Sequence, residues 1–171
     1  MTSPETPWLR RAGRGRAPDG SIVLWSLAEG ERGRRWRWSL ADPAGAIRHV
    51  GLIELDRAWI LERLELHAPA GIVTFHPAGD GKTAHGNVVM PQGVRPIEVG
   101  WTAGSRIGIA GDPFGTTLGA IAGAGTDLAG HEWTLLTSLE LQPMAIAPGL
   151  GVDARGVPVL DDPVEWPLER N

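Results

Sequence analysis

The stretch RRWRWSL, residues 34–40, decides the fold of this chain. Its large apolar residues occupy every second position, and arginine or serine occupies the positions between them. Successive side chains of a β-strand point to opposite faces of the sheet, so this alternation predicts a strand with one buried and one solvated face. Trp36 and Trp38 would then face an apolar interior, and the arginines beside them would face water.

Similar short runs continue along most of the chain, separated by turns rich in proline and glycine. Residues 59–66 favour a helix by propensity, but their short length and the strands on either side favour a strand. Residues 151–160 are predicted to form a closing hairpin, and residues 76–86 and 90–96 to form loops. The expected strands are residues 21–27, 34–40, 50–55, 59–66, 71–75, 87–89, 97–102, 106–110 and 132–141.

These strands predict an all-β protein: an antiparallel curled sheet, as a barrel or roll, with at most one short helix. No central parallel sheet is expected, because no two strands flank an amphipathic helix of about 10–15 residues. Trp8 and Trp166, close to the termini, are expected to lie outside the core. The expected core residues are Trp25, Trp36, Trp38, Leu64, Leu66, Val73, Phe75, Trp133, Leu135, Leu139 and Leu141.

The one predicted helix covers residues 113–124. Asp112 can serve as its N-cap, Pro113 suits its first position, and an apolar stripe follows at helical spacing. Three glycines at every fourth position would each cost roughly 1 kcal/mol relative to alanine. Their spacing makes sense if this ridge lets the backbone press closely against a sheet or a ligand. An irregular glycine-rich loop is the alternative.

Length and charge predict one domain preceded by a basic segment. The chain has 171 residues and no cysteine, so a disulfide scaffold and thiolate zinc sites are excluded. Residues 1–40 carry eight arginines against four acids, whereas residues 41–171 carry eight basic and sixteen acidic residues. We expect residues 1–20 to be a mobile basic tail and residues 21–171 to be a single β domain. No export signal or membrane span is recognisable, so a cytoplasmic location is the default expectation.

Several kinds of site find no support in the sequence. The run GDGKT, residues 79–83, lacks the first glycine and the following helix of a phosphate-binding loop. Nucleic acid binding is not expected, because the arginines of residues 34–40 face away from the tryptophans between them. No His-x-His pair occurs, so no metal site is predicted, although His76, His85 and a remote carboxylate leave a composite site open. No cofactor is expected.

Two alternative functions rest on particular segments. His76 or His85, on a flexible polar loop, could act as general base, with Asp80, Glu98 or Asp112 as the orienting acid. That arrangement would make the protein a small barrel-type hydrolase or isomerase. The other alternative is a structural or interaction protein that docks on an acidic partner through its basic tail.

Three short motifs occur once each, in this order, along residues 22–160: Asp56 with Trp59, Pro113-Phe114 followed by Thr117-Leu118, and a closing Val152-Asp153 and Gly156-Val157. This order resembles the glycolipid-binding family of small bacterial β proteins. The chain departs from the family's pattern at Thr116, where the family has asparagine, and at residues 119–123. The resemblance implies a curled, barrel-like sheet around an apolar channel, and an apolar ligand.

The leading prediction is a non-catalytic protein that binds an amphipathic or lipid-like molecule in an apolar cavity. The chain has eight tryptophans, two phenylalanines and no tyrosine, so its aromatic rings suit an apolar interior. The glycine-rich segment 111–125 would close the cavity by approaching the ligand closely. A small β-barrel either fills its interior with side chains or holds one small ligand. The expected ligand-binding residues are Trp36, Trp38, Trp59, Trp101, Phe114 and Leu118.

Overall fold

The computed structural model describes residues 9–122, 133–137, 140–144, 151–153 and 156–166. Nine strands form one antiparallel sheet: β1 (Arg10–Arg16), β2 (Ile22–Gly30), β3 (Gly33–Ala41), β4 (Ile47–Leu55), β5 (Leu61–Ala68), β6 (Gly71–Pro77), β7 (Thr83–Met90), β8 (Gly93–Gly100) and β12 (Asp161–Trp166). Their order is β12-β1-β2-β3-β4-β5-β6-β7-β8. A second sheet has the order β11-β10-β9, formed by β9 (Arg106–Ile109), β10 (Trp133–Thr137) and β11 (Glu140–Met144). The helix α1 is Pro113–Ile121.

The expectation of an antiparallel all-β fold with one short helix is confirmed. The large sheet is open and not closed into a barrel, with β12 and β8 at its edges. Each of these edge strands contains a proline, Pro163 and Pro96 respectively, and the edge strand β11 of the smaller sheet contains Pro143.

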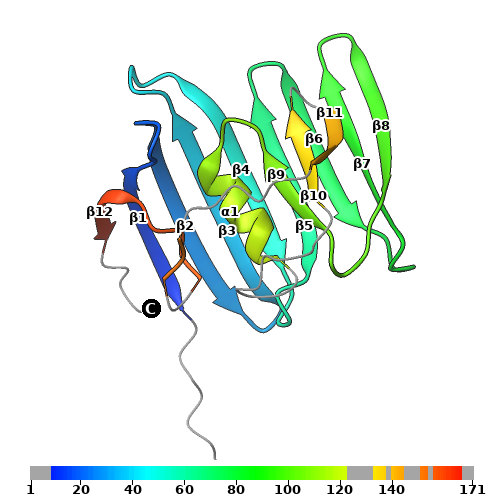
Figure 1. Cartoon of the computed structure of the whole chain (residues 1–171), viewed down its shortest axis with the longest axis horizontal. Coiled ribbons are helices and arrows are strands. Elements are labelled where there is room, and N and C mark those ends of the chain that lie inside the picture. The colour runs from blue at the N-terminus through cyan, green and yellow to red at the C-terminus, as the bar shows by residue number, and fades with distance from the viewer. Residues whose placement is uncertain (1–8, 123–132, 138–139, 145–150, 154–155, 167–171) are drawn as a thin grey trace, which may run out of the picture.

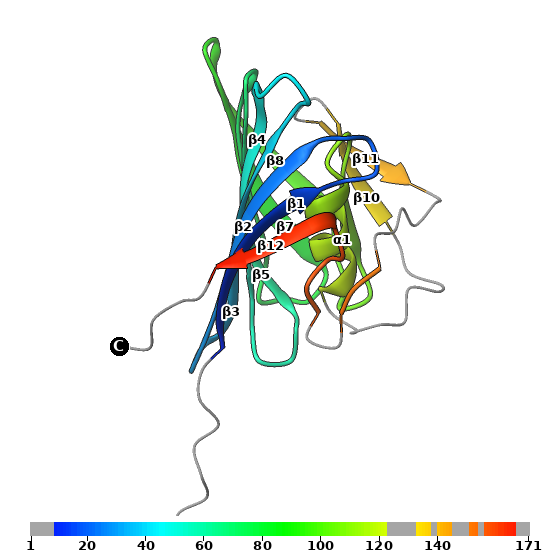
Figure 2. The ribbon, with the colours of Figure 1, turned by 90° about the vertical axis from the view of Figure 1, so that its left-hand side faces the viewer.

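The helix and the smaller sheet lie on one side of the large sheet (Figures 1 and 2). We call that side the covered face and the opposite side the outer face. α1 lies over β3 and β4, where Phe114 packs against Trp36 and Trp38. Among the described residues, no helix has the length and apolar character needed to cross a membrane.

The covered face carries the core, because alternate side chains of each strand point toward α1 and the smaller sheet. Trp166 is 44% exposed on β12, as predicted. Trp8 lies outside the described residues, and the side chains of Trp133, Leu135, Leu139 and Leu141 are likewise not described. The remaining expected core residues are all buried: Trp25, Trp36, Trp38, Leu64, Leu66, Val73 and Phe75.

The predicted helix is confirmed in place of the glycine-rich loop, although it ends at Ile121. Asp112 is its N-cap, and its Oδ1 accepts a hydrogen bond from Gly115 N at 2.8 Å. This bond satisfies one of the backbone donors that the first turn of a helix leaves free.

α1 is fastened to β9. A Cβ atom at Gly119 would overlap the carbonyl oxygen of Ile107, so glycine is what allows this close approach. One turn earlier, Thr116 Oγ1 donates to Ile109 O at 2.9 Å and accepts from Ile109 N at 2.8 Å. The threonine hydroxyl thus bonds both backbone groups at the end of β9, as a neighbouring strand would do.

The prediction of a mobile tail over residues 1–20 is wrong for residues 10–16, which form β1 between β2 and β12. On its covered face β1 has Gly13 and Gly15. A Cβ at Gly13 would lie 3.0 Å from the ring of Trp25, and one at Gly15 would lie 2.9 Å from Leu160 Cδ1. Larger neighbours fill the space above this strand, so it lacks the apolar alternation by which the other strands were recognised.

The single strand predicted at residues 132–141 is two strands, β10 and β11, paired as a hairpin. Leu136, the residue that breaks the alternation, pairs with Leu141. No proline or glycine lies between Trp133 and Leu141, so the sequence gives no turn signal and reads as one long strand. β10 also pairs in parallel with β9, and α1 lies between them in sequence, so the smaller sheet contains one parallel pair that was not predicted. The large sheet is antiparallel, as expected.

The predicted loops at residues 76–86 and 90–96 are shorter than expected, because β7 begins at Thr83 and β8 at Gly93. The predicted closing hairpin is reduced to one bridge, Val152 with Pro158. β12, which was not predicted, follows it.

Candidate functional site

Four aromatic rings meet between the covered face and α1. Trp25 and Trp36, on neighbouring strands, have ring centroids 5.9 Å apart. Phe114 of α1 lies 6.3 Å from the rings of both Trp36 and Trp38. We call Trp25, Trp36, Trp38 and Phe114 the aromatic cluster. Two of its tryptophans and its phenylalanine are among the residues expected to bind a ligand.

The indole of Trp38 lies between glycines of two different elements. A Cβ at Gly51 of β4 would overlap the ring, and one at Gly115 of α1 would lie 2.7 Å from it. The indole Nε1 donates a hydrogen bond to Asp112 Oδ2 at 2.8 Å. Because Asp112 is also the N-cap of α1, one buried carboxylate joins the start of the helix to the sheet.

A histidine lies beside this carboxylate. His49 Nδ1 is 3.3 Å from Asp112 Oδ2, and the His49 side chain is 14% exposed while that of Asp112 is fully buried. The two atoms form no hydrogen bond, so this buried nitrogen has no hydrogen-bond partner in the described structure. His49 was not singled out in the sequence, where it only precedes the apolar positions of β4.

The other expected ligand-binding residues are distributed unevenly. Leu118 is fully buried on α1, in the same layer as the aromatic cluster. Trp101 instead packs edge-to-face on Phe75 of β6, with centroids 5.1 Å apart. Since β3 and β6 are three strand spacings apart, about 14 Å, Trp101 belongs to a second aromatic contact.

Trp59 belongs to neither contact. It has a positive φ of 65°, which is uncommon for a residue with a side chain. The guanidinium carbon of Arg34 lies 3.7 Å from its ring centroid, a cation–π contact. A Cβ at Gly156 would lie 2.7 Å from the same ring, so Trp59 supports the segment that leads to β12.

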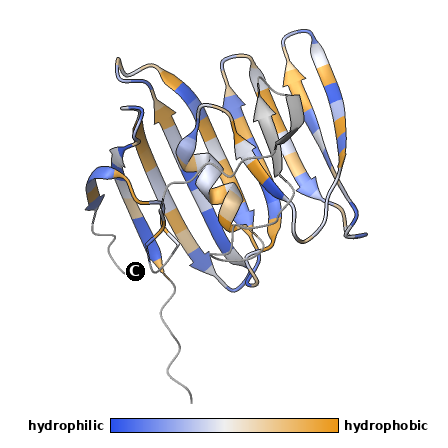
Figure 3. Cartoon of the chain, in the orientation of Figure 1, coloured by the Kyte–Doolittle hydropathy of each residue, from blue (hydrophilic) through white to orange (hydrophobic). Residues whose placement is uncertain are grey.

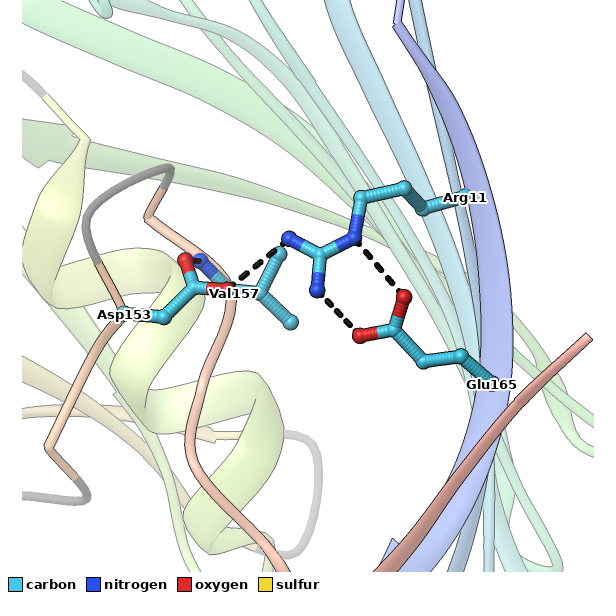
Figure 4. A network of polar contacts seen from close by, with 4 residues as sticks. All are labelled: Arg11, Asp153, Val157 and Glu165. Carbon is cyan, nitrogen blue, oxygen red and sulfur yellow. Dashed lines mark hydrogen bonds and ion pairs between the residues drawn. The ribbon is translucent and has the colours of Figure 1, made fainter.

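The final strand is tied to the aromatic cluster through Arg11 (Figure 4). Its Nε donates to Glu165 Oε2 at 3.1 Å, its Nη2 donates to Glu165 Oε1, and its Nη1 donates to Asp153 Oδ2 at 2.9 Å. The hydrogen bonds to Glu165 raise the pKa of Arg11. The same guanidinium lies 5.7 Å from the ring centroid of Trp25.

Five buried side-chain atoms of the described residues have no hydrogen-bond partner: Ser21 Oγ, Trp36 Nε1, His49 Nδ1, and Nε and Nη2 of Arg106. Buried polar groups are normally paired, so each of these needs an explanation. The indole N–H of Trp36 lies within the aromatic cluster, and Arg106 is the first residue of β9.

The histidines proposed as catalytic lie on the outer face. His76 and His85 are paired opposite each other on β6 and β7. His85 Nδ1 is 3.3 Å from Glu98 Oε2, and Thr83 Oγ1 is 3.3 Å from His85 Nε2. His76, His85 and Glu98, three of the predicted acid–base residues, therefore lie close together on an exposed surface.

Asp80 joins this group only through Thr83. Its Oδ1 accepts from the backbone N of Lys82 at 2.8 Å and of Thr83 at 3.0 Å, and its Oδ2 accepts from Thr83 Oγ1 at 2.9 Å. These bonds, the one from Lys82 first, lower the pKa of Asp80. The third acid considered, Asp112, is buried in the other layer with His49. In the described part of the chain, no three His, Asp or Glu side chains are grouped as a metal site.

No protein-family model matches this chain, and searches of curated proteins and of solved structures find no match either. The function must therefore be argued from the residues themselves.

Proposed function

We propose that the protein is a non-catalytic binding protein that holds an amphipathic, lipid-like molecule between α1 and the covered face. The aromatic cluster and Leu118 would contact the apolar part of this molecule. Aromatic rings bury large apolar areas with few rotatable bonds, which suits them to such a role.

The observation that carries the proposal is the unpaired Trp36 Nε1 inside the aromatic cluster. A buried N–H without an acceptor costs about 1–3 kcal/mol, whereas a phenylalanine at this position would avoid that cost. An acceptor atom of a bound molecule would remove it. His49 Nδ1 lies beside Asp112 and has no hydrogen-bond partner, so it offers a second polar contact in the same layer.

Entry of the molecule requires α1 to move. Phe114 and Leu118 are 0% exposed, so no water-sized space touches them in the closed state. α1 and β9 are joined to each other by the Thr116 hydroxyl, while the N-cap residue of α1, Asp112, accepts a hydrogen bond from Trp38 Nε1 of the large sheet. We therefore expect α1 and β9 to separate from the covered face as one unit when the molecule enters.

Native mass spectrometry of protein purified from its source, with titration of tryptophan fluorescence by fatty acids and glycolipids, tests the proposal. A copurifying amphiphile and a shift in emission are expected. Trp36→Phe keeps the ring and removes the N–H, so it should weaken binding, whereas Trp166→Phe on the exposed β12 should not. Absence of both a copurifying molecule and an emission shift would contradict the proposal.

A second candidate function is favoured by the line Asp80, Thr83, His85 and Glu98. Thr83 Oγ1 is hydrogen-bonded to both Asp80 and His85 Nε2, and His85 Nδ1 lies 3.3 Å from Glu98 Oε2. A carboxylate beside an imidazole can orient it for general base catalysis. The candidate is a hydrolase that acts at the outer face. Hydrolysis of activated esters that is lost in the double variant His76→Ala, His85→Ala would support it, and unchanged hydrolysis would remove it.

A further inference from the structure

Arg106 is a fully buried arginine whose charge has no counterpart in the described structure. It is 0% exposed at the start of β9. Its Nη1 donates to the carbonyl oxygens of Ser105 at 2.9 Å and Ala103 at 3.3 Å, while Nε and Nη2 have no partner. Among the described residues no carboxylate lies within ion-pair distance of it.

This burial is unfavourable unless an anion compensates it. An arginine keeps its charge inside a protein, and removing that charge from water costs more than two carbonyl hydrogen bonds return. Burial lowers the pKa of Arg106, because removal from water disfavours the charged form of the guanidinium. A methionine or leucine would fill the position without it, so the guanidinium indicates a function that the packing of β9 does not require.

The two unpaired nitrogens lie on one edge of the guanidinium. Nε–H and Nη2–H point in parallel and match the two oxygens of a carboxylate. Arg11 uses this same edge in this same protein, where Nε and Nη2 bond the two oxygens of Glu165 (Figure 4). Among the described residues, no carboxylate bonds this edge of Arg106.

The loop before β9 holds the guanidinium through Nη1. Thr102 N donates to Ser105 Oγ at 2.9 Å, and Ser105 N donates to Thr102 O at 3.0 Å, so the turn between Trp101 and Arg106 is held from both ends. The carbonyls of this turn hold Nη1 and leave Nε and Nη2 without a hydrogen bond. Arg106 is therefore held by the turn that follows Trp101, one of the residues expected to contact a ligand.

We infer that the Nε–Nη2 edge of Arg106 binds the carboxylate, or a comparable two-oxygen anionic group, of the amphipathic molecule. This inference rests on the proposed binding function and narrows the ligand to an anionic amphiphile. The apolar chain would lie in the layer between β9 with α1 and the covered face.

The test compares dodecanoate with dodecanol at pH 8, using the full chain and both fluorescence titration and thermal unfolding. The wild type should bind dodecanoate about tenfold to a hundredfold more tightly than dodecanol, as expected for a charge-assisted bidentate pair. Arg106→Met should abolish that preference and should raise the Tm of the ligand-free protein, because it removes a buried unpaired charge. A role that is only structural would instead lower the Tm.

Two further variants keep the result unambiguous. Arg37→Met makes the same chemical change at an exposed arginine on the outer face, and it should alter neither the preference nor the Tm. Arg106→Lys retains the charge but not the two-donor edge, so it should keep only part of the preference.

The possible outcomes distinguish the role of Arg106 from the proposed binding function. Equal binding of dodecanoate and dodecanol by the wild type would overturn the role of Arg106 and leave the binding function standing. Binding of neither compound would overturn both. A ligand-free Arg106→Met protein less stable than the wild type would overturn the inference whatever the wild type binds.

Discussion

The covered and outer faces of the large sheet are built by alternate residues of the same nine strands, yet they follow different rules (Figure 3). On the covered face the core side chains are closely packed, and the space for Trp38 depends on the absence of a Cβ at Gly51 and Gly115. On the outer face, one row of paired residues mixes apolar, charged and polar side chains. In sheet order the row is Val164, Arg14, Leu24, Ser39, Val50, His67, Ile72, Val89 and Val94.

Solvent explains this difference. In that row Leu24, Val50, Val89, Val94 and Val164 are between 40% and 64% exposed, so each can be exchanged without forcing a neighbour to move. A side chain in a close-packed interior has no such freedom. The covered face can therefore be identified from the alternation of apolar residues along each strand, whereas the residues of the outer face are hardly restricted in type.

Trp36→Ala should give the largest effect on the covered face. Removing a fully buried indole leaves a large cavity, and the free energy of unfolding should fall by about 3–5 kcal/mol. Trp166→Ala, at a position 44% exposed, should change it by less than about 0.5 kcal/mol. Urea unfolding measures both. Similar values for the two variants would remove the distinction between the faces.

Asp112→Ala tests the polar contact that the covered face does contain. It leaves Trp38 Nε1 without its acceptor and α1 without its N-cap, so we expect a loss of about 2–3 kcal/mol. Asp42→Ala is the matched control, since Asp42 Oδ1 accepts from Ala46 N in an exposed turn. Its effect should stay below about 1 kcal/mol. An equal effect in the two variants would show that burial does not strengthen the contact.

Acid should weaken the outer face through Asp80 and Glu65. The pKa of Asp80 is lowered by its backbone hydrogen bonds, and that of Glu65 chiefly by its hydrogen bond with His67. A lowered pKa adds stability above the value in the unfolded chain, and that stability is lost as pH falls through the folded value. The Tm difference between the wild type and Asp80→Asn should therefore be constant near pH 6 and shrink below pH 3.8, the ordinary pKa of aspartate. A difference that grows on acidification would contradict this.

Val94→Ser should have the smallest effect, less than about 0.5 kcal/mol, because Val94 is 64% exposed on the edge strand β8. Val73→Ser makes the same change at a position that is 0% exposed on the covered face of β6. It loses buried apolar surface and adds a hydroxyl, so it should cost several-fold more in denaturant unfolding. Comparable losses would mean that the outer row is covered in solution.

The sequence predicts a strand correctly where its two faces differ in polarity. The prediction fails where glycine stands in place of a large apolar residue, or where the chain reverses its direction without a turn signal. β3 is recognised from Trp36 and Trp38 alone. β1 is missed because Gly13 and Gly15 make room for the side chains of Trp25 and Leu160, so its fit depends on residues distant in sequence. β10 and β11 appear as one strand because no proline or glycine marks the reversal between them.

The candidate site is predictable only in part, for a similar reason. Trp36, Trp38, Phe114 and Leu118 lie in one layer because strand and helix periodicities both direct them there. Trp101 and Trp59 have the same side chain as Trp36 and Trp38 but belong to other contacts. No local sequence pattern distinguishes these two residues from the members of the aromatic cluster.

The polar atoms of the site are harder still to predict. His49 and Arg106 could have been noticed only as polar residues at apolar positions of a strand. Whether a buried polar atom has a hydrogen-bond partner depends on the whole fold and cannot be predicted from the spacing of residues.

The edges of the two sheets have a consequence for the protein in a crowded solution. An exposed strand edge is a template on which a second chain can add by hydrogen bonding. Pro96, Pro163 and Pro143 each remove a donor from the edge strands β8, β12 and β11, and the Thr116 hydroxyl occupies both backbone groups of Ile109 on β9. All four edge strands are thus interrupted, which disfavours the addition of a second chain to the open sheet.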